Sequence, residues 1–587
     1  MKKSSWLSPE RFSPQRYERE LEVVIDALCA EPQLDAEALR RIVTRHPKPD
    51  GGFFSKSELV WAARRAASRS ADPAELEGLI PRLRAKPIRT QSGVTPVTVL
   101  TRPHPCPGRC VFCPNDPRAP KSYLAGEPGA QRAARFGYDA YAQVTGRLRA
   151  LALMGHPVDK IELIILGGTW TAYPEAYRLA FVSGCFRALN EFRPDSADTL
   201  DLTPLVDRTE PSIGPYGKRL GTREYNRLVE PGPEGMAERA APTVTQWHRL
   251  AALHQANESA LCRCVGMSVE TRPDQVTMEA ALALRRLGVT RVQIGCQSLS
   301  DRILELNHRD HSVEDSRQAI ALLRRFGFKV QVHWMANLLG TTPEADVEDF
   351  ARLFDDIGVR PDEIKIYPCM VVPNSELADA YERGDHVPYS TETLVDVLAR
   401  CLRMVPPYCR VNRLMRDIPG TDVVGGSRHN SLRGQVEARI EALGSVCRDI
   451  RSREIRTRTQ QLSPPRMEIL EVPTAASREY FIEFVSDGLL CAFARLGLPH
   501  LPAPLPELSG AALLREVHVY GQAAALGARP AVAVQHRGLG ARLVDQATQL
   551  ASQAGYRSLA VISSVGTRGY YRRLGFADGA LYQHRRL

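Results

Sequence analysis

The chain has 587 residues, of which 43% are hydrophobic and 25% charged, with a formal net charge of +10, as in a globular protein of two or more domains. No apolar run reaches membrane-spanning length and residues 1–6 lack the apolar core of a secretion signal, so we expect a cytoplasmic protein without membrane contact. Its 13 cysteines favour a reducing compartment over a disulfide framework, and the positive charge suits a polyanion, although an ordinary basic surface explains it equally well.

Residues 1–90 are predicted to form basic helices. Arg16 to Leu28, Ala36 to Arg45 and Leu59 to Ser68 carry apolar residues at helical spacing. The basic residues of this region include Lys56, Arg64, Arg65, Arg69, Arg82, Arg84, Lys86 and Arg89. They form either a solvated helical face or a surface that binds a polyanion.

Between residues 91 and 420, short apolar strands alternate with helical patterns, which predicts a parallel sheet with crossover helices. The six candidate strands are Val97–Thr101, Ile161–Leu166, Cys264–Glu270, Arg291–Gln297, Lys329–Trp334 and Glu363–Tyr367. We therefore predict an α/β fold built on a partial (β/α)6 barrel, with its chemistry at the C-terminal strand ends. Residues 191–245 fit no periodic pattern and are predicted to be a surface insertion.

Three cysteines, Cys106, Cys110 and Cys113, follow the first candidate strand at a C-x3-C-x2-C spacing. Closely spaced cysteine thiolates hold cubane iron–sulfur clusters, and three thiolates leave one iron of a 4Fe-4S cluster open. An open iron can bind S-adenosyl-L-methionine (SAM), and this spacing is the signature of radical SAM enzymes. A structural zinc site is the alternative, but zinc usually takes four ligands and the sequence offers no second C-x2-C pair.

Polar and glycine residues end the later candidate strands. Gly167, Gly168 and Thr169 follow the second strand, where glycines let a ligand approach the backbone, and we expect them to contact the methionine part of SAM. Glu270, Gln297 and His333 fall at or near strand ends. They either face the same cavity or are satisfied polar groups of the core.

Residues 421–465 are predicted to be a basic linker and 466–587 a second α/β domain, with strands Leu514–Val519 and Leu559–Ser563. Between these strands lies a glycine-containing helix start, Gln535-His536-Arg537-Gly538-Leu539-Gly540. It matches the Q/R-x-x-G-x-G/A pattern of GNAT acetyltransferases, in which a helix N-terminus binds the pyrophosphate of coenzyme A.

Two further features strengthen the acetyl-CoA prediction. The strand residues Glu516, Val517, His518 and Val519 lie where GNAT proteins pair pantetheine with a strand. Tyr570 and Tyr571 begin a stretch that resembles the Y-x-x-x-G-F end of that fold, where a tyrosine protonates or orients the departing thiolate. Both tyrosines are therefore catalytic candidates, and core packing is the alternative.

A radical SAM barrel followed by a GNAT domain resembles the catalytic subunit of the Elongator complex, which also occurs as a single chain in bacteria and archaea. The resemblance runs from about Lys86 to Leu587. The segments that match this family are Lys86–Thr90, the cysteine loop, Ser122–Pro128, Asp159-Lys160 ahead of Gly167–Thr169, Val269–Asp274, Ile294–Ser298, Lys365–Pro368, Arg416–Pro419, Cys447–Glu454 and Glu516–Gly521.

This resemblance implies an enzyme that installs a carboxymethyl group at position 5 of the tRNA wobble uridine. A 4Fe-4S cluster and SAM would generate an adenosyl radical, which takes hydrogen from the methyl of acetyl-CoA, so an electron donor is also implied. The basic N-terminal region would contact tRNA phosphates. Acetyl-CoA would meet Lys160, Glu516–Val519, Val534 to His536 and Tyr571, and a homodimer or accessory subunits remain open.

Two other functions are weighed against this one. A protein lysine acetyltransferase with a structural cluster needs a general base, for which Glu516 is the candidate. A tRNA-binding scaffold with vestigial sites is disfavoured by the intact cysteine triad and coenzyme A loop. Cys401, Cys409 and Cys447 are a minor candidate for a further metal site, weakened by Ser452 where some single-chain relatives carry a cysteine.

Overall fold

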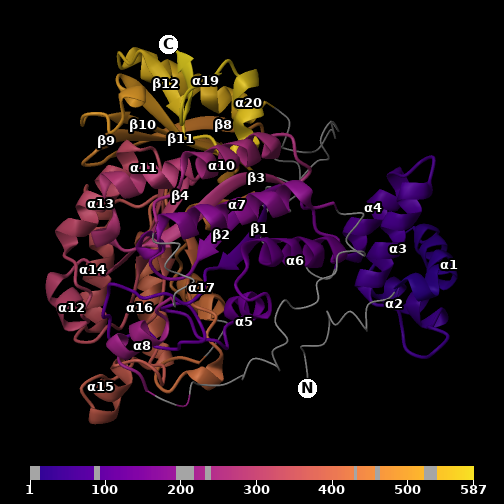
Figure 1. Ribbon diagram of the computed structural model, residues 1–587, viewed down its shortest axis with the longest axis horizontal. Coiled ribbons are helices and arrows are strands. Elements are labelled where there is room, and N and C mark those ends of the chain that lie inside the picture. Colours follow the sequence, from indigo (N-terminus) through magenta and orange to yellow (C-terminus); the bar gives the residue numbers. More distant parts are fainter. Residues whose placement is uncertain are drawn as a thin grey trace.

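The computed structural model describes residues 14–32, 34–84, 93–193, 217, 219–231, 240–428, 432–455, 463–520 and 538–587. Figure 1 shows three parts: a small helical bundle, a parallel sheet surrounded by helices, and a second sheet with two helices. Within the described ranges, no helix combines the length and the apolar character needed to cross a membrane.

The N-terminal bundle contains the three helices expected there and one more, α4; residues 1–13, Lys86 and Arg89 of the predicted basic region lie outside the described residues. It contains η1 (Pro14–Tyr17), α1 (Glu18–Cys29), α2 (Ala36–Arg45), α3 (Lys56–Arg69) and α4 (Ala74–Leu83), packed on their own apolar core. A capping box between Ser55 and Glu58 begins α3, because the serine and glutamate satisfy each other's backbone N–H groups. Arg84 donates to the carbonyl of Gly155 at 2.7 Å and so links the bundle to the barrel.

The central sheet has seven strands in the order β1 to β7, all parallel. They are β1 (Thr95–Leu100), β2 (Lys160–Leu166), β3 (Arg263–Thr271), β4 (Arg291–Gln297), β5 (Lys329–Trp334), β6 (Glu363–Ile366) and β7 (Arg410–Arg413). The α/β partial barrel is confirmed, with one strand more than the six predicted. The additional strand, β7, is four residues long and reads Arg-Val-Asn-Arg, so it lacks the apolar run by which the others were found.

Helices cover the outside of this barrel. They are α5 (Pro128–Arg135), α6 (Ala140–Leu153), α7 (Glu175–Glu191), α8 (Thr222–Leu228), α10 (Val244–Asn257), α11 (Met278–Arg286), α12 (Asp301–Leu306), α13 (Val313–Arg325), α14 (Pro343–Asp355), α15 (Leu377–Arg383), α16 (Thr391–Met404), α17 (Leu432–Ala442) and α18 (Ile450–Arg453). Short 3-10 turns are η2 (Trp170–Ala172), η5 (Pro273–Gln275) and η6 (Gly420–Asp422). Helices α17 and α18 lie in the segment predicted to be a linker.

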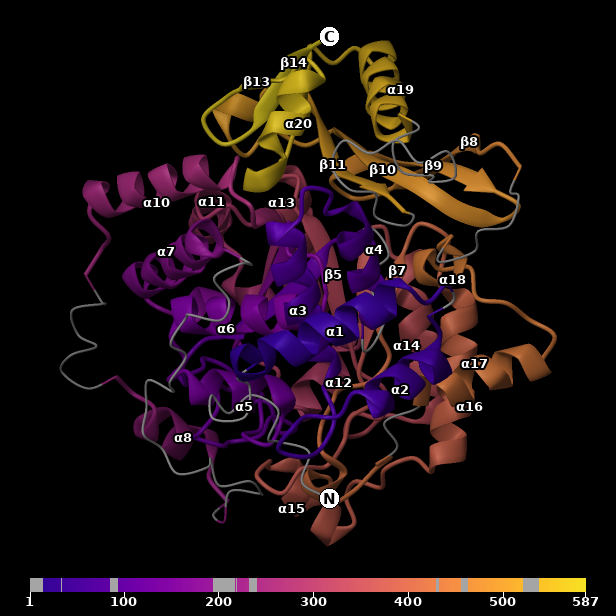
Figure 2. The same ribbon diagram turned by 90° about the vertical axis from the view of Figure 1, so that its right-hand side faces the viewer.

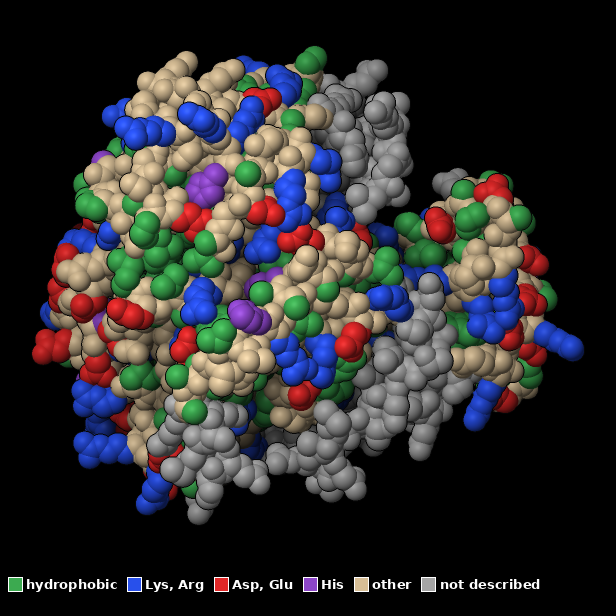
Figure 3. Space-filling model, turned by 45° about the horizontal axis from the view of Figure 1, so that its top comes forward, with side chains coloured by type: hydrophobic (Ala, Val, Ile, Leu, Met, Phe, Trp, Pro, Cys, Tyr) green, Lys and Arg blue, Asp and Glu red, His purple; other side chains and the backbone are tan. Residues whose placement is uncertain are grey.

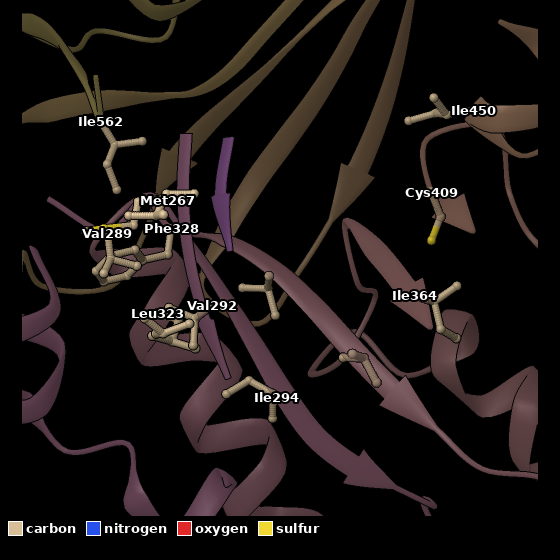
Figure 4. Close-up of a cluster of buried hydrophobic side chains, with 14 of the residues drawn as sticks. Met267, Val289, Val292, Ile294, Leu323, Phe328, Ile364, Cys409, Ile450 and Ile562 are labelled. Atoms are coloured by element: carbon tan, nitrogen blue, oxygen red, sulfur yellow. The ribbon is translucent and has the colours of Figure 1, made fainter. Parts of the chain in front are cut away.

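Alternation along the strands separates an apolar outer face from a polar lumen. Val292 and Ile294 of β4 belong to the buried core together with Leu323 of α13, as Figure 4 shows. Their neighbours Arg291 and Gln293 line a cavity inside the barrel instead. The interior is therefore not filled by apolar side chains and leaves room for ligands.

The C-terminal part is a seven-stranded sheet in the order β13-β14-β12-β11-β10-β9-β8. Its elements are β8 (Arg466–Pro473), β9 (Ser477–Ser486), β10 (Leu489–Pro499), η7 (Pro506–Leu508), β11 (Ala511–Val519), α19 (Leu539–Gln553), β12 (Ser558–Val561), η8 (Val565–Thr567), α20 (Arg568–Arg573), β13 (Ala577–Asp578) and β14 (Gln583–Arg586). The pairing of β11 with β12 ends at Leu514 and Val561, whereas β11 continues to Val519. The two strands thus diverge beyond Leu514.

The second sheet lies across the N-terminal end of the barrel strands (Figure 2). Arg515 of β11 donates to Asp362 and, at 2.7 Å, to the carbonyl of Phe328, which lie just before β6 and β5. Ser564 donates to the carbonyl of Cys264 at the start of β3, at 2.8 Å. Ile562 joins Met267, Val289 and Phe328 in a shared apolar cluster (Figure 4), so the two parts have one continuous core.

Candidate active site

A cavity of about 190 Å³ lies at the C-terminal ends of the barrel strands. Its lining contains all three predicted cluster cysteines and most of the predicted SAM-contacting residues: Cys106, Cys110, Cys113, Gly168, Thr169, Glu270, Gln297 and His333. Residues that are far apart in the sequence therefore meet at the barrel end where this fold places chemistry.

The cysteine loop brings cationic groups to a buried thiol. Cys110 Sγ lies 2.9 Å from Arg309 Nη1 and 3.6 Å from Arg272 Nη1. A hydrogen bond from Cys113 and the charges of Arg309 and Arg272 lower the pKa of Cys110, so its thiolate is favoured. Cys106 Sγ lies 3.6 Å from Thr169 Oγ1, which places the loop beside the predicted SAM-binding turn.

This donor set fits a 4Fe-4S cluster. In the described part of the chain, no three His, Cys, Asp or Glu side chains converge as ligands of a single metal ion. A cubane gives each cysteine its own iron, so its three thiolates need not meet at one point. The guanidinium groups of Arg272 and Arg309 match the negative charge that thiolates bring to a cluster. Gly108 leaves space for this packing, because a Cβ there would lie 1.9 Å from Arg272 Nη1.

Helix α8 supports the cysteine loop, although it lies in the segment expected to be a surface insertion. Asn226 accepts from the backbone N–H of Cys106 and donates to its carbonyl, both at 3.0 Å. Tyr225 of the same helix is fully buried. The sequence around α8 is polar and aperiodic, so it gave no sign of this helix. The contacts of α8 are with a loop that lies far away in the sequence.

The glycine turn after β2 is organised by Glu270. One carboxylate oxygen accepts the N–H groups of Gly167 and Gly168 at 3.0 and 2.9 Å, and the hydroxyl of Tyr123 at 2.9 Å. A Cβ on Gly167, at φ +148°, would lie 1.7 Å from Thr101 Oγ1, so the position needs glycine. The turn can therefore approach a ligand closely.

Gln297 and His333 complete the polar lining. Gln297 adopts a positive φ of 70°, a strained conformation for this residue type. Its buried Oε1 has no hydrogen-bond partner among the described residues, so it is available to accept a hydrogen bond from a ligand. Burial and the nearby Lys365 lower the pKa of His333, which keeps the imidazole neutral.

A second cavity, of about 570 Å³, occupies the barrel lumen and reaches the C-terminal sheet. Glu516, Val517, His518 and Tyr571 line it at that end. The residues that line both cavities are Tyr123, Glu127, Leu166, Lys365 and Arg413. The lumen cavity therefore shares part of its wall with the cavity of the cysteines and reaches the C-terminal sheet at its other end.

Two parts of the predicted coenzyme A site, β11 and the start of α19, lie in the described residues. The part of β11 from Glu516 to Val519 extends beyond its pairing with β12, which ends at Leu514. Gly538, with a φ of +73°, is the N-cap residue directly before α19. A Cβ on Gly540 would lie 2.6 Å from Tyr570 Oη, so this helix start approaches the tyrosine closely.

The remaining predicted contacts differ in their placement. Val534, Gln535, His536 and Arg537 lie outside the described residues. Lys160 begins β2 at the barrel end that faces the C-terminal sheet, but it does not line the lumen cavity. Tyr571 is buried and burial raises its pKa, so the phenol stays protonated and can donate a proton. Tyr570 is half-buried beside Gly540.

Glu516 is held as an anion. It lies 2.6 Å from Lys329 Nζ and 3.0 Å from Arg495 Nε. Burial opposes ionisation, but these two cations lower the pKa of Glu516. A carboxylate that is bound by two cations is a poor proton acceptor, which weakens it as the base of a lysine acetyltransferase.

Several residues of the site were not found from the sequence. Arg272 and Arg309 reach Cys110 from distant loops, and Lys365 lies where the two cavities meet. Arginine and lysine are usually surface residues, so their burial gave no local signal. Cys401 and Cys409 are core residues, and Cys447 is part-buried; they join no group of metal ligands in the described part of the chain.

Comparison with known proteins agrees with this geometry. Residues 242–354 match the Radical SAM superfamily and residues 361–442 match the Radical_SAM C-terminal domain. The chain is 37% identical over 507 residues to a tRNA uridine(34) acetyltransferase of Dehalococcoides mccartyi, covering 85% of this chain and 99% of that protein. It is 33% identical to Elongator complex protein 3 of Danio rerio, over 92% of this chain and 94% of that protein.

A solved structure is similar over most of its length. The archaeal Methanocaldococcus infernus Elp3 with an N-terminal deletion (1-46) superposes with a TM-score of 0.65 and 30% sequence identity. The match covers 85% of this chain and 100% of that chain. The similarity therefore extends through both sheets.

Proposed function

Because this chain belongs to the family of the tRNA uridine(34) acetyltransferases and Elongator complex protein 3, we propose that it modifies the wobble uridine of tRNA by radical SAM chemistry. The family expected from the motifs is thereby confirmed. We further propose that acetyl-CoA is the co-substrate and that the product is a 5-carboxymethyl uridine.

The lumen cavity, which shares wall residues with the cavity of the cysteines and reaches the C-terminal sheet, supports this proposal most strongly. The cluster and SAM, when bound, supply a radical able to remove hydrogen from an unactivated methyl carbon. Cys106, Cys110 and Cys113 would hold three irons, and Gly167 to Thr169 with Glu270 and Gln297 would orient SAM. The part of β11 beyond its pairing with β12 and the start of α19 would hold coenzyme A where the lumen cavity reaches the C-terminal sheet.

The N-terminal bundle is proposed to contact tRNA phosphates. Figure 3 shows Lys and Arg side chains on the bundle and on the neighbouring barrel face, mixed with acidic residues. Arg65 and Arg69 both pair with Glu18, at 2.6 and 2.9 Å, which reduces the positive charge of that face. Exposed Arg40 and Arg45 of α2 remain stronger candidates. An electron donor, the cytoplasmic location and the domain limits given above also remain predictions.

The experiment is a nucleoside profile of bulk tRNA by mass spectrometry. We expect deletion of the gene to remove 5-carboxymethyl-type uridines and the wild-type gene to restore them. Cys110→Ser should fail to restore them while the purified protein still binds acetyl-CoA, because the cysteines and β11 lie at opposite ends of the barrel. An unchanged nucleoside profile after deletion would contradict the proposed function.

A further inference from the structure

Lys365 is a part-buried amine in the wall shared by the two cavities. It lies on β6, lines both cavities, and its Nζ is 2.5 Å from Gln293 Oε1. The same oxygen lies 3.2 Å from His333 Nε2. Among the described residues, no carboxylate lies within ion-pair distance of Lys365, although charged groups surround it.

Lys329 provides a comparison within the same lumen. It is as deeply buried, but it pairs with Glu363 at 3.0 Å and Glu516 at 2.6 Å, and these carboxylates raise its pKa against burial. It is therefore a permanent cation at neutral pH, committed to the contact between β5 and β11. Lys365 has no such pair and is free to change its protonation.

Burial has the largest influence on the protonation of Lys365. It lowers the pKa to about 7 against Glu270 on β3, which is the largest charge effect and raises the pKa; Arg413 on β7 and Arg291 on β4 lower it further, and Glu363 on its own strand opposes them. His333 on β5 is neutral and adds no charge. A lysine that is part amine at neutral pH can accept a proton.

The proposed reaction places a thioester beside this amine. Coenzyme A enters from the β11 end, and the acetyl methyl must reach the cavity of the cysteines. The thioester carbonyl is bonded directly to that methyl carbon, so it lies where the cavities meet. A bond to the uridine ring leaves the thioester intact, and a carboxymethyl product still requires its hydrolysis.

We propose that Lys365 is the general base for hydrolysis of the thioester, an inference that rests on the proposed function. Lys365 Nζ takes a proton from water as the water oxygen bonds to the carbonyl carbon. The carbon–sulfur bond then breaks, and the coenzyme A thiolate takes up a proton from the Lys365 ammonium or from Tyr571. Water and thioester give a carboxylic acid and a thiol, with no oxidation or reduction.

The test measures thiol release from acetyl-CoA by the full-length protein with tRNA, from pH 5.5 to 9. Wild-type release should rise with pH to a plateau with a midpoint near 7, because only the amine accepts a proton. Lys365→Met keeps the length of the side chain and Lys365→Arg keeps the charge, but neither titrates in this range. Both should slow hydrolysis about 100-fold, a usual contribution of a general base, and should lose the rise near pH 7.

Acetyl-CoA and tRNA affinities, measured by calorimetry and filter binding, should stay within about threefold in both variants. If Lys365→Arg keeps the wild-type rate and pH profile, the inference is overturned. If both variants bind neither ligand, Lys365 is structural and the inference also fails. A wild-type protein that releases no thiol and forms no carboxymethyl uridine would instead overturn the proposed function, and this inference with it.

Discussion

Glu270 shows how one side chain can organise a binding turn. Its carboxylate accepts two N–H groups of the glycine turn and the Tyr123 hydroxyl, so it fixes the backbone beside which SAM is proposed to bind. Hydrogen bonds to charged groups contribute about 1.5–3 kcal/mol each. We therefore expect Glu270→Ala to weaken SAM binding by at least tenfold and to reduce 5'-deoxyadenosine formation by the anaerobically reconstituted protein.

Glu270→Gln is the matched variant, because its amide oxygen still accepts the two N–H groups. It should retain more SAM affinity than Glu270→Ala, and both should bind acetyl-CoA normally. Equal SAM affinity in wild type and Glu270→Ala, measured by equilibrium dialysis, would refute this role of the turn.

At the scale of elements, the divergence of β11 from β12 and the start of α19 form the proposed coenzyme A site. Gly540 keeps this start close to Tyr570, because an added Cβ would lie 2.6 Å from the hydroxyl. Gly540→Ala should displace Tyr570 and raise the Kd for acetyl-CoA by about tenfold, or about 1.4 kcal/mol, as measured by calorimetry.

Gly434→Ala is the control for this substitution. Gly434 lies in α17, and a Cβ there would meet nothing within 4 Å. This variant should stabilise the protein by up to about 1 kcal/mol without changing acetyl-CoA affinity. Unaltered binding by Gly540→Ala would show that the helix start lies away from the ligand.

At the scale of the molecule, a buried ion network joins the barrel to the C-terminal sheet. Asp362 binds Arg515 and lies 3.5 Å from Arg495, and burial is outweighed by these cations, which lower the pKa of Asp362 well below its usual range. Removing one partner leaves buried cations uncompensated, so Asp362→Asn should destabilise the protein by about 3–5 kcal/mol. Chemical denaturation at pH 7 measures this difference.

The sign of the pH dependence follows from the lowered pKa. The stability contributed by Asp362 is complete above its unfolded pKa of about 4 and is lost as the pH falls further toward its folded value. Wild type should therefore lose more stability than Asp362→Asn between pH 4 and pH 2.5. Parallel losses in both proteins would mean that Asp362 does not carry this acid sensitivity.

Local patterns were sufficient to predict the barrel and the cysteine loop, because apolar alternation and ligand spacing are properties of short segments. Strand β7 was not predicted because its sequence, Arg-Val-Asn-Arg, contains only one apolar residue, Val411. The contact of Asn226 with Cys106 and of Arg309 with Cys110 join segments more than 100 residues apart, so no local pattern encodes them. The titration of Lys365 depends on burial and on charged neighbours from three other strands, which only the folded chain assembles.

The lumen cavity reaches β11 of the C-terminal sheet and shares part of its wall with the cavity of the cysteines. A pantetheine arm bound along β11 would close the lumen at the C-terminal sheet. An RNA bound beside the cysteines would close the cavity at that end. With only one of these two ligands bound, water would still reach it from the other end. This geometry favours formation of the radical only after both coenzyme A and RNA have bound.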